Sequence, residues 1–137
     1  MHTNPLSRAV TRSISIQAAP EAVFGFVADP NTLPLWAPGA AKSVRPDGDQ
    51  WVLHSGEGET RVIVRASEEL GTVDLLMAED PSRGVFTRVL PNGGGSEYQF
   101  TLFFPDGTPE DAVATQVAVI DDELEAVRDH CEATRES

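Results

Sequence analysis

The C-terminal quarter of the chain carries a long apolar stripe at helical spacing. The string Thr108-Pro109-Glu110-Asp111 is a typical helix opening, because proline fits the first turn and acidic side chains favour the helix N-terminus. From there to about residue 133, apolar side chains recur at steps of three and four. They are Val113, Val117, Ile120, Leu124, Val127 and Cys131. A helix of about 25 residues is about 37 Å long, enough to cross a sheet. We therefore expect one helix over about 109–133 whose apolar side covers a sheet.

The segment before this helix reads as strands separated by turns. The turn signals are Asp47-Gly48, Gly56-Glu57-Gly58, Leu70-Gly71, Asp80-Pro81 with Gly84, and residues 91–95. They leave six predicted strands, at 40–46, 50–55, 60–67, 72–78, 84–90 and 96–104. Strands at such regular spacing are typical of an antiparallel meander.

The N-terminal part predicts one more strand and two short helices. Residues 10–17 alternate between apolar and polar side chains, as a strand does. Pro20 then suits the first turn of a helix that Asp29-Pro30 ends, and the same pair opens a second short helix. We expect Pro34 to stop that second helix, so that Trp36 follows in a loop.

This order of elements predicts an α+β helix-grip fold in a single domain, 1–137, with an ordered core of about 8–133. A curved antiparallel sheet of seven strands would wrap around the long helix, with the two short helices after the first strand. Because a curved sheet does not touch a straight helix everywhere, we expect an apolar cavity between them, open toward the short helices.

Charge and composition exclude several classes of partner. The formal net charge of −12 would repel nucleic acid and anionic membrane surfaces. No apolar run reaches the roughly 20 residues needed to cross a bilayer, so we expect a cytoplasmic protein without membrane insertion. One cysteine and three scattered histidines argue against a metal site, and no cofactor is expected.

Several side chains are candidates for the cavity wall. Tyr98 and Phe100 share one face of the last strand and would form its floor if that face points inward. The same interpretation applies to five further apolar residues, and for all of these side chains core packing is the alternative. The five are Phe24, Met77, Val117, Ile120 and Leu124. Met77 would offer an adaptable wall to a flexible apolar ligand.

Few residues could carry chemistry. His54 is the one histidine within the predicted sheet and would act as an acid or base if it faced the cavity; otherwise it is an ordinary strand histidine. Arg61 and Arg65 share one face of a strand and would bind a carboxylate or phosphate if that face were internal. The sequence does not decide which face they occupy, and no catalytic residue is assigned.

The chain also resembles a known family. The strings ISIQAAPEAVFGFVADPNTLPLW at 14–36, WAPG at 36–39 and RVLPNGGGSEYQFTLFF at 88–104, with the closing helix, are similar to those of the SRPBCC superfamily. This superfamily includes START lipid-transfer domains, birch-pollen-allergen proteins and polyketide cyclases. The chain resembles small bacterial members of it that are described as polyketide cyclase/dehydrase-like. The resemblance implies the helix-grip fold and places Trp36 at the mouth of the cavity.

Two functions follow, and the residues favour the first. One is binding or carrying of a hydrophobic or aromatic small molecule, which needs only a cavity and a few polar anchors. The other is a polyketide cyclase- or dehydratase-like enzyme using His54 and Tyr98, which needs an acid or base in the cavity. A protein-interaction surface is a third, weaker hypothesis, and a homodimer is one assembly open to such a domain.

Overall fold

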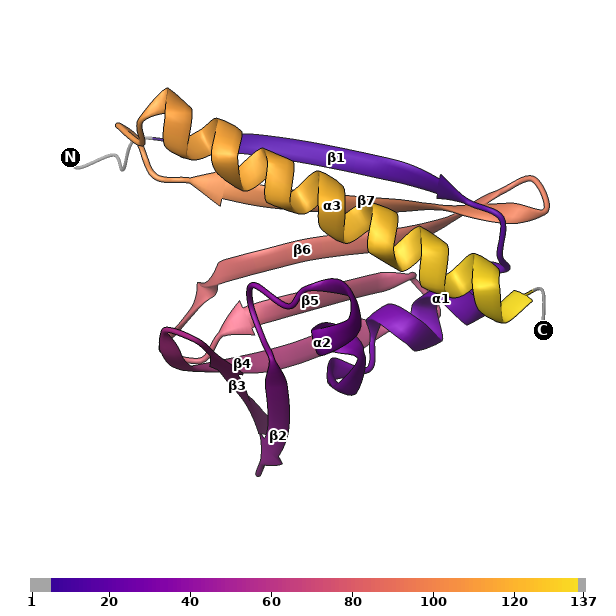
Figure 1. Ribbon diagram of the computed structural model, residues 1–137, viewed down its shortest axis with the longest axis horizontal. Helices are drawn as coiled ribbons and strands as arrows, with labels where there is room; N and C mark the ends of the chain where they lie inside the picture. The colour runs from indigo at the N-terminus through magenta and orange to yellow at the C-terminus, as the bar shows by residue number, and fades with distance from the viewer. Residues whose placement is uncertain (1–5, 136–137) are drawn as a thin grey trace.

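A seven-stranded antiparallel sheet curves around the long C-terminal helix in the computed structural model, which describes residues 6–135 and the side chains of 6–133. In chain order the elements are β1 (Arg8–Ile16), α1 (Pro20–Val27), the 3-10 helix η1 (Pro30–Thr32), α2 (Leu33–Trp36), β2 (Ser43–Asp47), β3 (Gln50–Ser55), β4 (Gly58–Ser67), β5 (Thr72–Met77), β6 (Asp80–Asn92), β7 (Gly95–Phe104) and α3 (Glu110–Arg135). The predicted helix-grip α+β fold is confirmed (Figure 1).

The sheet order is β1-β7-β6-β5-β4-β3-β2, so the first strand pairs with the last. The register sets Ile14 opposite Tyr98 and Ile16 opposite Ser96. Side chains alternate along each strand, so these residues share one face with Phe100. We call this the inner face, because it packs against α3, and the opposite one the outer face.

Helix α3 lies over β1 and is tied to it by polar contacts along its length (Figure 1). Arg12 donates two hydrogen bonds to Asp121, at 2.8 and 3.0 Å, and Arg8 pairs with Glu110. At the other end Glu132 accepts the backbone N–H of Gln17 at 2.9 Å. One flank of α3 therefore faces β1, while its apolar stripe faces the middle of the sheet.

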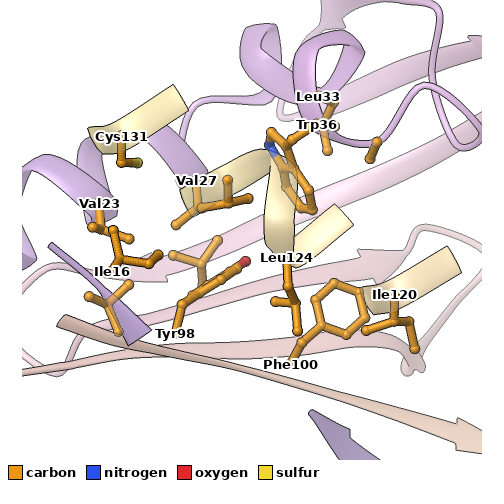
Figure 2. Close-up of a cluster of buried hydrophobic side chains, with 14 of the residues drawn as sticks. Ile16, Val23, Val27, Leu33, Trp36, Tyr98, Phe100, Ile120, Leu124 and Cys131 are labelled. Atoms are coloured by element: carbon orange, nitrogen blue, oxygen red, sulfur yellow. The ribbon is translucent and has the colours of Figure 1, made fainter. Parts of the chain in front are cut away.

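The inner face, α3 and the short helices share one buried cluster (Figure 2). Trp36, Tyr98 and Leu124 are each at most 3% exposed. Two hydrogen bonds within the short-helix segment hold the Trp36 ring in place. Its Nε1 donates a hydrogen bond to Thr32 Oγ1 at 3.3 Å, and the Thr32 hydroxyl donates one to the Phe26 carbonyl at 2.7 Å. The side chains of the core are packed against one another at this point.

Two local predictions are wrong. Pro34 does not stop the second short helix but lies in the first turn of α2, where a missing N–H costs nothing, and Trp36 ends that helix. The turn expected at residues 80–84 lies at residues 78–79 instead, so β6 begins at Asp80 and includes Pro81 and Gly84. Proline is tolerated there because it falls at a bulge.

Candidate functional site

Strands β6 and β7 pair at one end of the sheet and part at the other. Their register runs from Asn92 opposite Gly95 to Phe86 opposite Thr101. Beyond that point Asp80, Gly84 and Val85 of β6 pair with β5 alone, and residues 102–104 of β7 pair with β1 alone. Figure 1 shows the two strands diverging toward the end where α3 begins. The sheet is therefore split where its other strands remain joined.

A cleft of about 740 Å³ occupies this split. Its walls are mostly apolar, and its lining is Leu6, Ser7, Met77, Ser82, Arg83, Gly84, Val85, Phe86, Leu102, Phe103 and Pro105. Val85 and Leu102 are half-buried and also pack against the buried cluster, so the cleft reaches the core from outside. Its volume lies in the range of about 300–1,000 Å³ that small-molecule sites occupy.

An aromatic pair stands where the strands part. Phe86 of β6 and Phe103 of β7 meet edge to face, with ring centroids 5.8 Å apart and an interplanar angle of 80°. Phe103 is still 49% exposed. Aromatic side chains of this kind supply a large contact area to a ligand at low conformational cost.

A bulge in β6 shapes the opposite wall. Leu76 pairs with Gly84 and Met77 pairs with Asp80, so the three residues between Asp80 and Gly84 have no partner on β5. Gly84 adopts a φ of +154°, and a Cβ there would lie 2.2 Å from the Leu75 carbonyl oxygen. Only glycine lets the two strands approach so closely just after the bulge.

The bulge also supplies two polar side chains of the cleft, Ser82 and Arg83. Asp80 accepts hydrogen bonds from the Ser82 hydroxyl at 2.6 Å and the Ser82 N–H at 3.2 Å, and these bonds lower the pKa of its carboxyl. Arg83 is the one charged residue in the lining. The cleft thus combines an apolar wall with a single guanidinium group.

The predicted site residues do not come together in this cleft. Of the nine, Met77 lines it, whereas Trp36, Tyr98, Phe100, Ile120 and Leu124 are buried in the core cluster of Figure 2. Val117 is half-buried on α3, and Phe24 lines a separate groove between α1 and the loop at Glu68–Gly71.

His54 and the two arginines lie on the outer face. Leu53 belongs to the buried cluster, so His54, the next residue of β3, points the other way, with its Nδ1 3.4 Å from Glu59 Oε1. Arg61 pairs with Asp47 at 2.7 Å and Arg65 with Asp74 at 2.8 Å. The sequence did not decide which face Arg61 and Arg65 occupy, and in the structure it is the outer one. A site on the inner face therefore does not include His54, Arg61 or Arg65.

The sequence analysis missed Glu123. This residue lies on α3 three positions after Ile120 and four before Val127, both fully buried, so its side chain is drawn toward the inner face. Burial, and secondarily the charge of Asp122, raises the pKa of its carboxyl to about 7. Its charge also acts on the buried Tyr98, whose pKa is raised chiefly by burial. The sequence feature that could have identified Glu123 is an acidic residue at the edge of the apolar stripe of α3.

The described residues offer little other chemistry. No group of three histidine, cysteine or acidic side chains among residues 6–133 is arranged to hold a metal ion. Cys131 is buried, which raises the pKa of its thiol to about 11 and keeps it protonated at neutral pH. Within the described part of the chain, no helix has the length and apolar character that crossing a membrane requires.

Comparison with known proteins places this arrangement in a family. Residues 7–132 match the family described as polyketide cyclase / dehydrase and lipid transport. The chain belongs to that family. The resemblance to the SRPBCC superfamily is thereby confirmed. A comparison with curated proteins finds no match.

Solved structures share the fold of this polyketide cyclase / dehydrase and lipid transport family member. The protein XoxI from Bacillus cereus is 18% identical, with a TM-score of 0.74 over 93% of this chain and 97% of that one. A START superfamily protein from Mycobacterium smegmatis is 16% identical, with a TM-score of 0.71 over 92% and 98%. The Aha1 dimer from Colwellia psychrerythraea is 16% identical, with a TM-score of 0.70 over 91% and 96%. At such identities the likeness concerns the fold.

Proposed function

We propose that this protein binds a hydrophobic or aromatic small molecule in the cleft between β6 and β7. The observation that carries the proposal is the cleft itself, about 740 Å³ in volume and walled by the side chains of Val85, Leu102 and Phe103. Such a site stabilises an apolar ligand by removing its surface from water, at about 25 cal/mol per Å².

The placement of the titratable side chains favours binding over catalysis. The lining of the cleft includes no histidine, cysteine or carboxylate that could transfer a proton. His54, on which the enzymatic hypothesis depended, points to the outer face. Tyr98 is 1% exposed and contributes to the cluster behind the cleft.

In this proposal the predicted site residues have two roles. Met77 contacts the ligand directly, because it lines the cleft. Phe100, Ile120 and Leu124 hold Leu102 and Val85 in place through the buried cluster. A homodimer and a cytoplasmic location stay predictions.

Titration with N-phenyl-1-naphthylamine, a neutral apolar fluorophore, tests the proposal. We expect saturable binding with one site per chain, and we expect Phe103→Ala to weaken it about tenfold because part of the apolar wall is lost. Leu35→Ala is the matched control, since Leu35 is 53% exposed on α2 and lies outside the cleft. Absence of saturable binding, or equal affinity in both variants, would contradict a site in this cleft.

A further inference from the structure

We propose that the ligand of this cleft is an anionic amphiphile, with its apolar chain against Leu102 and Phe103 and its anionic head on Arg83. This rests on the proposed function and adds the chemical class of the ligand. The head is a carboxylate, sulfate or phosphate, since all three accept the charge-assisted hydrogen bonds of a guanidinium group.

Arg83 differs from most other arginines of the described chain. Five of them form ion pairs with acidic side chains: Arg8, Arg12, Arg61, Arg65 and Arg128. No carboxylate among the described residues lies within ion-pair distance of Arg83, which is exposed and stands in the wall of the cleft. Its donors are therefore available to a bound anion.

Asp80, the acid of the bulge, is engaged through one of its oxygens. Asp80 precedes Arg83 by three residues in the bulge, and its Oδ1 accepts both hydrogen bonds from Ser82. The charge of Arg83 has only a minor effect on the pKa of this carboxyl. Asp80 therefore stabilises the conformation of the bulge and does not pair with the guanidinium group of Arg83. The bulge presents that group to the cleft.

The charge of the whole molecule makes this position selective. A net charge of −12 repels anions over most of the surface. A guanidinium group beside an apolar wall supplies local attraction there, and an apolar neighbourhood strengthens it because less water screens the pair. A neutral amphiphile gains binding free energy only from contact with the apolar wall. An anionic amphiphile gains it from that contact and from the charge of Arg83.

Displacement of N-phenyl-1-naphthylamine from the full chain tests this inference. The competitors are decanoate, decyl sulfate, decanol and decyltrimethylammonium, each below its critical micelle concentration. We expect both anions to bind about tenfold more tightly than decanol, and the cation more weakly than decanol. In Arg83→Gln the preference for the anions over decanol should disappear.

The control variant is Arg88→Gln. Arg88 is also exposed and also lacks an ion-pair partner among the described residues, but it lies outside the cleft. It should keep the full preference for anions. Equal binding of decanoate and decanol, or a preference that persists in Arg83→Gln, would overturn the inference while leaving the apolar site intact. Failure of every competitor and of the fluorophore would overturn the proposed function itself.

Discussion

Arg12 of β1 and Asp121 of α3 form a two-pronged ion pair, Nε to Oδ1 at 2.8 Å and a second guanidinium nitrogen to Oδ2 at 3.0 Å. The pair joins the edge strand to the flank of the helix across 109 positions of sequence. It lies on the flank of α3 that faces β1, and the lining of the cleft between β6 and β7 includes no residue of α3.

This ion pair should contribute modestly to stability. Both side chains are 40% or more exposed, and solvent screens such pairs. We expect a double-mutant cycle with Arg12→Ala and Asp121→Ala, followed by urea denaturation, to give a coupling of about 0.5–1 kcal/mol. The sequence neighbours Arg128 and Asp129 form a matched pair within one helix, for which a smaller coupling is expected. A coupling of zero for Arg12 and Asp121 would contradict a contribution of this pair to the stability of the fold.

The bulge that shapes the cleft depends on Gly84. A methyl group at this position would meet the Leu75 carbonyl, and the φ of +154° disfavours any other residue. Gly84→Ala should lower the free energy of unfolding by about 2 kcal/mol or more. Gly39→Ala is the control, since its Cβ would meet nothing within 4 Å, and it should change stability by less than about 0.5 kcal/mol. Chemical denaturation of both variants measures the difference.

Removing the charge of Glu123 should change the pH dependence of stability. Its pKa is raised from 4.5 to about 7, so the folded state holds the proton more tightly than the unfolded state does. The stabilisation from this group is therefore complete below about pH 4.5 and is lost as the pH rises through about 7.

Glu123→Gln should thus be more stable than the wild type at pH 8 by about 2 kcal/mol at most, and this gain should shrink toward pH 4. Glu125→Gln is the control, because Glu125 is exposed on the same helix. Urea denaturation across this pH range measures both. A gain for Glu123→Gln that is independent of pH would show that burial does not hold the carboxyl protonated.

The apolar stripe of α3 should account for much of the stability of the fold. Ile120 is fully buried and lies in the cluster with Leu124 and Phe100 (Figure 2), so Ile120→Ala should cost about 3 kcal/mol. Val119, its neighbour, is 38% exposed, and Val119→Ala should cost less than about 1 kcal/mol. Thermal and urea unfolding compare the two, and similar losses would place the stripe on a different side of the helix.

Local patterns predicted the elements better than they predicted their boundaries. The spacing from Val113 to Cys131 determines a helix by itself, and turn residues such as Asp47-Gly48 separate strands wherever they occur. The wrong boundaries lie at Pro34 and Pro81, because proline ends an element only where the backbone needs its N–H. At the first turn of α2 and in the bulge of β6 it does not.

The sequence by itself determined the class of fold, the number of strands and the apolar side of α3, because each depends on contacts close along the chain or on a simple period. Only the tertiary structure decided where a ligand can enter. The outward position of His54 depends on which face of the sheet α3 covers, the burial of Glu123 depends on how α3 packs against that face, and the place of Arg83 depends on where β6 and β7 part. A shift of one residue in strand register reverses which face a side chain occupies, and no local pattern records it.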